Sequence, residues 1–215
     1  MPTPRRFYDI KYHGKNYIVV GLDQSYKDTG ISISMNGKLK TATHCYTDNL
    51  ENNTEKRKAL KEMLDKTFTK AVEMKKKYNA KLICCIERTR LKSQGFINIS
   101  YIKSTGALNA LIVDTAMEYG IKVYSADTRA WKSAVVGTSK GKPNPYGLDE
   151  KKFPTIEWCI YKGYDKYIRK YDVGKSTRGI LMEGGVKYTY NDNICDSICI
   201  SLYPFVSGHK LKKEH

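Results

Sequence analysis

Residues 17–22 read YIVVGL, a short run of apolar and β-branched residues that ends at Asp23. Such a run predicts a buried strand. Residues 30–35 alternate enough to form its hairpin partner, and Asn36-Gly37 supplies a tight turn into a third strand at 38–45. The sequence therefore predicts a chain that opens with three antiparallel strands.

Beyond these strands, helical and strand patterns alternate. The spacing of apolar residues predicts helices at 55–78 and 100–119, and short buried strands at 81–87 and 121–125. The segment at 128–136 follows without an assigned element, and further helical patterns lie at 150–162 and 191–203. This order predicts an α/β fold in which helices flank a mixed five-stranded sheet.

The remaining segments have a different character. Residues 139–149 are rich in Gly, Pro and Lys and predict a loop, whereas 166–187 is basic and is expected to be mobile. We expect one domain, with boundaries that we place as follows: a basic N-terminal arm at 1–16, the domain at 17–205 and a solvated basic tail at 206–215.

The charge balance points to a polyanionic partner. The 215 residues include 38 Lys and Arg against 22 Asp and Glu, a formal net charge of +16. Such a surplus favours nucleic acid or an anionic membrane surface as partner, with a merely solvated basic surface as the alternative. No apolar run approaches the roughly 20 residues that span a bilayer, and no secretory signal opens the chain. The six cysteines lie mostly in apolar stretches, which indicates reduced core thiols in a cytoplasmic protein that is not secreted.

Four carboxylates lie at strand ends or on one face of a predicted helix. Asp23 ends the first strand, Glu87 ends the strand at 81–87, and Asp192 and Asp196 lie four apart on one face of the last helix. Converging carboxylates with no competing His or Cys suit two divalent ions, which can activate a water and stabilise charge on a phosphate. The pattern therefore predicts a site for two divalent ions such as Mg²⁺ and cleavage of phosphodiesters.

Each acid also has a purely structural interpretation. Asp23 could cap a turn, and Glu87 could pair with the arginines that follow it. Asp192 could be an N-cap or a first-turn acid favoured by the helix dipole. Asp196 is harder to explain in this way because it lies within an apolar helical pattern. The order of all four acids favours the metal site.

At these motifs the chain resembles RuvC-type Holliday junction resolvases, which have the RNase H-like fold. Residues 20–23 (VGLD), followed by Thr29-Gly30, resemble their first catalytic strand and turn, and 82–87 resembles their second acidic strand. Residues 192–197 (DNICDS) resemble the closing Asp-Asp-x-x-x-Asp-Ser motif of the fungal mitochondrial enzymes, with Asn193 in second place. The turn at 24–26 (QSY) departs from the common Pro-Gly-Ser, and a viral or phage version in a bacterial cell or an infected host fits the pattern.

The resemblance implies paired, symmetric nicking of four-way DNA junctions by a homodimer that uses Mg²⁺ or, alternatively, Mn²⁺. It implies that the four acids hold the metal ions, and that basic catalytic residues stand at Lys132 and Lys152. Lys151 is the alternative to Lys152, because the insertion at 140–148 leaves that alignment open. The helix at 100–119 resembles the dimer helix of the family, and its small residues at Gly106, Ala107 and Ala110 would allow close approach.

Basic residues are predicted to contact DNA phosphates and to give salt-sensitive affinity. The predicted contacts are Arg88, Arg90, Lys140, Lys142, Lys151, Lys166, Arg169, Lys170 and Lys175. Three other functions stay open at this stage. They are another nuclease on the same fold, such as a ribonuclease H, an actin-like ATPase or sugar kinase, and a DNA-binding module without activity. The missing Asp-x-Gly after the first strand argues against the second, and the four intact acids argue against the third.

Overall fold

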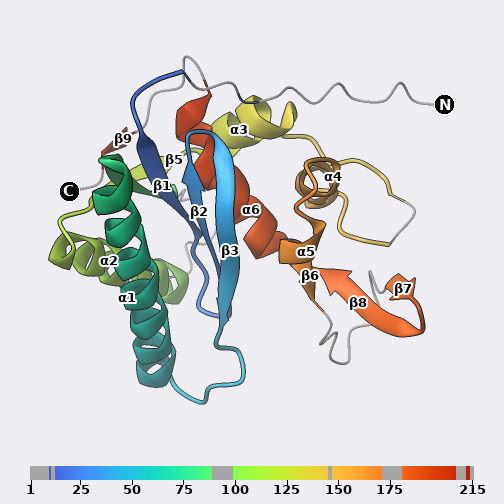
Figure 1. The fold of residues 1–215 in the computed structure, drawn as a ribbon. Coiled ribbons are helices and arrows are strands. Elements are labelled where there is room, and N and C mark those ends of the chain that lie inside the picture. Colours follow the sequence, from blue (N-terminus) through green and yellow to red (C-terminus); the bar gives the residue numbers. More distant parts are fainter. Residues whose placement is uncertain are drawn as a thin grey trace.

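A mixed sheet runs through the centre of the molecule, with α1 and α2 covering one face and α6 the other (Figure 1). The computed structural model describes residues 10, 13–88, 99–144, 147–170, 181–206 and 212–213. Arg90 and Lys175, two of the predicted DNA contacts, lie outside the described residues, as does most of the predicted N-terminal arm.

The strands follow the order β3-β2-β1-β4-β5-β9. Their bounds are β1 Tyr17–Asp23, β2 Asp28–Met35, β3 Lys38–Tyr46, β4 Lys81–Glu87, β5 Lys122–Ala126 and β9 Lys212–Lys213. The first three strands form an antiparallel meander, and β4 and β5 run parallel to β1. These five strands confirm the predicted mixed sheet. The short β9 was not predicted: the sequence indicated a solvated tail there, whereas its backbone pairs with β5.

The long helices are α1 Asn53–Tyr78, α2 Ile99–Glu118 and α6 Asp192–Leu202. The segment at 128–136, to which the sequence assigned no element, is α3 Thr128–Trp131 followed by a π-helical turn, η1 Lys132–Val136. Helix α4, Phe153–Tyr161, begins three residues later than predicted, because Pro154 stands in its first turn, where a missing N–H costs no helical hydrogen bond. A short 3₁₀ turn, Tyr203–Phe205, follows α6.

The basic segment at 166–187 contains regular structure that the sequence did not predict. After α5 Asp165–Ile168, its described parts form a small sheet of order β6-β8-β7, drawn as the hairpin beside α5 in Figure 1. The strands are β6 Arg169–Lys170, β7 Leu181–Glu183 and β8 Val186–Tyr190. The guanidinium of Arg169 lies 4.6 Å from the ring centroid of Tyr188, which packs β6 against β8.

The two faces of the central sheet are packed by different means. On the α1 face, alternate strand residues such as Leu22 and Ile31 join a continuous apolar core with Phe68 of α1. On the other face, α6 lies directly against strand backbone. A Cβ at Gly21 would stand 2.4 Å from the carbonyl oxygen of Ser197, and one at Gly30 would stand 1.9 Å from that of Asn193. Both positions therefore require glycine.

Buried hydroxyls extend this contact along α6. The Ser32 hydroxyl donates to the carbonyl of Ser197 at 2.8 Å, and the hydroxyls of Ser34 and Ser201 share a hydrogen bond of 2.6 Å. We call Gly21, Gly30 and these four serines the Gly/Ser seam. The seam sets the first turn of α6 over the carboxyl end of β1, because Gly30 pairs with Asp23.

The six cysteines are all free and buried, which confirms that they are core thiols. Among the described residues, no helix combines the length and apolar character that crossing a membrane would require.

Candidate metal and catalytic site

Asp23 and Glu87 end neighbouring parallel strands. Leu22 is paired with Ile86, so the two carboxylates come one position later on adjacent strands. Leu22 and Ile86 face the apolar core under α1, and side chains alternate along a strand, so both acids face α6. The sheet thus brings together two acids that are 64 positions apart in the sequence.

Asp192 and Asp196 approach the same place from α6, one turn apart. Burial raises the pKa of the Asp23 carboxyl well above its usual range, the charges of Asp196, Glu87 and Asp192 raise it further, and Lys132 lowers it. Burial also raises the pKa of Asp196 to about 7, against the lowering effect of Lys132. All four predicted acids therefore belong to one electrostatic site.

Each α6 acid is next to a lysine. The Lys132 ammonium lies 3.6 Å from Oδ2 of Asp196, and the Lys152 ammonium pairs with the Asp192 carboxylate. Partial burial lowers the pKa of Lys152, but its hydrogen bond to Asp192 outweighs this and leaves the pKa raised. Lys151, the alternative from the sequence, is exposed and donates its backbone N–H to Asp149. Of Lys151 and Lys152, Lys152 is therefore the one whose side chain reaches an acid of the site.

Trp131 joins two parts of the site. Its buried indole Nε1 donates to Oε1 of Glu87 at 3.3 Å, and the Lys132 ammonium lies 5.1 Å from its ring centroid. The π-helical turn begins at Lys132, and Asp127 caps α3 by accepting from the N–H groups of residues 129 and 130. Sequence analysis gave no indication of this contact between Trp131 and Glu87.

Gln24 is a second residue whose role the sequence did not indicate. Its side-chain amide donates to the Glu87 carbonyl at 2.5 Å and accepts from the Glu87 N–H at 3.1 Å. The side chain thus extends the β1–β4 pairing beyond Asp23 and holds the ends of the two strands together. Its only sequence signal was the departure from Pro-Gly-Ser after Asp23.

Asn191 resolves one of the structural interpretations of Asp192. Asn191, and not Asp192, is the N-cap of α6: its Oδ1 accepts from the Ile194 N–H at 3.0 Å. Asp192 stands in the first turn, where a carboxylate is favoured by the helix dipole as well as by any cation in the site.

The donor set suits a hard divalent cation. The buried Oδ1 of Asp196 has no hydrogen-bond partner among the described residues, and neighbouring carboxylates raise the pKa of Asp23 and Asp196. A divalent cation would bind the unpartnered oxygen and offset the repulsion between the carboxylates. Mg²⁺ and Mn²⁺ prefer such oxygen ligands. As the described side chains stand, no three Asp, Glu, His or Cys residues are arranged to hold one ion. The α6 acids contact lysines instead.

The predicted DNA contacts divide into two groups. Lys140, Lys151 and Lys166 are exposed, which leaves them accessible to a phosphate backbone. Lys142 and Arg169 are held within the protein: the Lys142 ammonium lies 2.6 Å from Oε1 of Glu157, and Arg169 pairs with carboxylates at 165 and 183.

Two further predicted contacts are half-buried. The Lys170 ammonium lies 4.6 Å from the ring centroid of Tyr46, and Nε of Arg88 lies 3.5 Å from the Ser125 hydroxyl. Of the described predicted contacts, only Lys140, Lys151 and Lys166 are therefore exposed.

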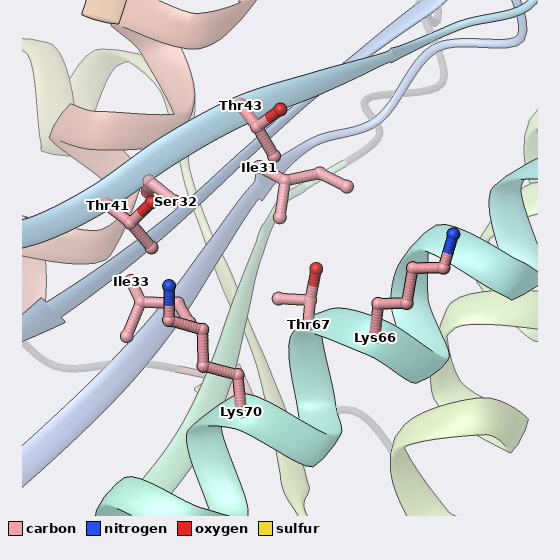
Figure 2. Close-up of a pocket in the computed structure, with 8 residues that line it drawn as sticks. All are labelled: Ile31, Ser32, Ile33, Thr41, Thr43, Lys66, Thr67 and Lys70. Carbon is pink, nitrogen blue, oxygen red and sulfur yellow. The ribbon is translucent and has the colours of Figure 1, made fainter.

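Two grooves in the described part of the molecule differ in which residues line them. The larger, about 770 Å³, adjoins the acids and is lined by Gly147, Leu148, Asp149, Glu150, Lys152, Ile156, Thr189, Tyr190 and Asp192. The smaller, about 140 Å³, lies between α1 and strands β2 and β3, with Lys66 and Lys70 at its rim (Figure 2). None of the four acids lines the smaller groove. The larger one is therefore the concavity of the candidate site.

Two solved structures have the same fold. Thermus thermophilus RuvC matches with a TM-score of 0.53 and 13% identity, over 92% of this chain and 99% of that chain. T. thermophilus RuvC in complex with a Holliday junction substrate matches with a TM-score of 0.52 and 12% identity, over the same shares. No family model and no curated protein matches this chain. The RNase H-like fold expected from the resemblance to RuvC-type resolvases is confirmed, whereas the activity rests on the site.

Proposed function

We propose that the protein is a metal-dependent endonuclease that resolves four-way (Holliday) DNA junctions by paired nicks, in DNA recombination and repair. One observation carries the proposal: four carboxylates from three separate elements share one site, and a lysine stands beside each acid of α6. The fold shared with RuvC, one structure of which holds a Holliday junction substrate, supports the junction as substrate.

Asp23, Glu87, Asp192 and Asp196 would hold two Mg²⁺ or Mn²⁺ ions. When bound, such ions supply an activated water and stabilise charge on the attacked phosphate. The chain itself supplies the placement of these oxygen donors. Glu87 is fixed through Trp131 and through the paired amide of Gln24, and Gly21 and Gly30 let α6, which carries the other two acids, lie directly on the sheet.

The two lysines would act on the phosphate. An ammonium group beside the acids can stabilise charge that builds on the phosphate, or protonate the leaving oxygen. Lys132 suits this role because its backbone lies between buried Trp131 and the buried Val135 and Val136, so little freedom is lost when its side chain engages. Lys152 directly precedes α4 and lines the larger groove, where a substrate strand would enter.

The contact with DNA would be made by exposed cations around that groove. Lys140, Lys151 and Lys166 are the predicted contacts that stay exposed, and they would neutralise phosphates and release counterions. Lys142 and Arg169 would first have to leave their carboxylate partners, so we expect them to contribute less to affinity.

Paired nicks need two sites at a fixed separation, which a two-fold dimer supplies. Helix α2 suits that interface. Its Leu108 and Ile112 pack inward, whereas Gly106, Ala110 and Met117 are exposed, Met117 at 65%. A Cβ at Gly106 would meet nothing within 4 Å, so a second helix could approach closely there. Sedimentation of the protein at cleaving concentrations tests this, and a strict monomer would refute it.

The decisive experiment uses a mobile four-way junction labelled on each strand in turn. With Mg²⁺ we expect nicks on two opposing strands at symmetric positions, and none in the presence of a chelator. A linear duplex and an RNA–DNA hybrid of the same sequence serve as comparison substrates. Preferred cleavage of the hybrid would instead assign the site to a ribonuclease H activity, since the same four carboxylates would serve it.

A further inference from the structure

A buried polar cluster ties the first turn of α6 to the sheet. Asn191 is 4% exposed and uses both ends of its side-chain amide. Its Oδ1 caps α6 by accepting from the Ile194 N–H, and its Nδ2 donates to Oδ2 of Asp28 at 2.9 Å. The cap alone needs only the oxygen, so the second bond calls for its own explanation.

His44 completes this cluster from β3. Its Nδ1 lies 2.5 Å from Oδ1 of Asp28 and 3.2 Å from Nδ2 of Asn191. An ionised carboxylate only accepts, so the arrangement that satisfies all three groups has His44 Nδ1–H and Asn191 Nδ2–H each donating to one oxygen of Asp28. Charge-assisted bonds of this kind are stronger than neutral ones. Asp28 therefore joins β2, β3 and α6 at one point.

The cluster lies close enough to the acids to influence their positions. Asp23, Gly30 and His44 occupy one register row on three adjacent strands, and Gly30 lies under Asn193 of α6. The first turn of α6 thus rests on Gly30, with Asp23 on one neighbouring strand and His44 on the other. Asn191 directly precedes Asp192. A lateral shift of this turn would change how far Asp192 stands from Asp23.

We propose that Asp28, His44 and Asn191 are positioning residues that fix the first turn of α6 and thereby set where Asp192 meets the other acids. The consequence for metal binding rests on the proposed function, whereas the positioning itself does not. The Gly/Ser seam fixes how closely α6 approaches the sheet. The cluster of Asp28, His44 and Asn191 fixes the lateral position of the N-terminal end of α6 over the strands. Nothing in the sequence pattern indicated this role for His44.

Asn191→Ser separates positioning from capping. Serine is also a good N-cap, so the bond to the Ile194 N–H is retained, while the donor to Asp28 is lost. His44→Leu removes the other donor from the opposite strand. Ser201→Ala is the matched control, because it removes a buried hydrogen bond between α6 and the sheet at the far end of the helix. The thermal stability of all three variants is first compared with that of the wild-type protein.

The first readout is hydrogen exchange of the Ile194 and Cys195 amides in the metal-free protein. Asn191→Ser and His44→Leu should speed exchange there about fivefold, the effect of losing one net hydrogen bond. Ser201→Ala should leave these two amides unchanged. Equal exchange in all variants would overturn the positioning role, whatever the protein's activity.

The second readout is Mn²⁺ affinity, measured by electron paramagnetic resonance without DNA. Groups that orient metal ligands typically change metal affinity by about 10–100-fold when mutated. We expect Asn191→Ser and His44→Leu to fall in that range, and Ser201→Ala to stay near wild type at comparable stability. Affinity that merely follows stability in all three variants would show the cluster to be structural only. Failure of the wild-type protein to bind Mn²⁺ would instead count against the proposed function.

Discussion

The helices on the two faces of the central sheet pack against the strands in different ways. Under α1 and α2, large apolar side chains such as Ile31 and Phe68 interlock, and loss of a methyl group there costs stability in small steps. Under α6, glycines and serines bring helix and strand backbones into contact through buried hydrogen bonds, and a second apolar cluster that includes Val19, Ile83 and Trp131 packs beside this contact. The first face supplies stability that tolerates variation. The second supplies a fixed position, and it is the face that carries the four acids.

The largest effect should come from the acids themselves. Asp23→Asn should lower the cleavage rate constant by on the order of 10²–10³, as loss of one group that serves transition-state charge typically does. Junction affinity should stay close to wild type, because phosphate contacts lie elsewhere. Single-turnover cleavage and a gel-shift titration measure the two. Ile31→Val on the opposite face is the control, and full activity in Asp23→Asn would refute the site.

The seam should be the next most sensitive feature, and here the readout is stability. Gly30→Ala places a Cβ within 1.9 Å of the Asn193 carbonyl, so α6 must move away or the protein must unfold. We expect a cost at or above the usual 1–3 kcal/mol of overpacking. Ile33→Val, on the same strand but the other face, should cost about 0.5–1.5 kcal/mol. Urea unfolding measures the loss of unfolding free energy in both variants. Equal losses would contradict the proposed difference between the two faces.

Lys132 and Lys166 should separate chemistry from binding. Lys132→Ala should slow single-turnover cleavage at saturating protein by about 10²-fold, the low end for loss of a general acid. Lys166→Ala should keep that rate and instead weaken junction affinity and its salt dependence. Cleavage by Lys132→Ala at the wild-type rate once bound would move Lys132 into the phosphate-binding group.

The smallest effect concerns pH. Burial raises the pKa of Asp196 to about 7 in the folded protein, above its value of about 3.9 in an unfolded chain. The folded state therefore holds the proton more tightly, and stability from this group is lost as pH rises from about 4 through 7. Metal-free Asp196→Asn should thus melt above wild type at pH 8, and the difference should shrink towards pH 4. Thermal melts at several pH values test this, and a variant that melts below wild type at pH 8 would contradict it.

The sheet and the acids could be predicted because their signals are local. A run such as 17–22 is buried on both faces and ends at a carboxylate, and parallel strands bring their carboxyl ends to one edge. Asp192 and Asp196 share a face through helical spacing alone. Each of these inferences needs only neighbouring residues and one topological rule.

The contacts that hold the site in place depend on strand register and could not be predicted in this way. The bonds of Gln24 and Trp131 to Glu87 and of Asn191 to Asp28 join residues 63, 44 and 163 positions apart. Charge counting also fails to show pairing, because it treats Lys142 as free for DNA although Glu157 holds it. The hairpin of β7 and β8 was missed because its strands are too short for a periodic signal.

The lysines beside α6 make metal uptake a competition. Lys132 lies against Oδ2 of Asp196 and Lys152 against Oδ2 of Asp192, so a cation that binds either of these two oxygens must displace an ammonium group. Metal affinity and lysine release are then linked, so whatever draws the lysines away also favours metal loading. A DNA phosphate is such a group. The protein would therefore load its metal most readily with substrate bound, and an enzyme without DNA would keep its acids neutralised by its own side chains.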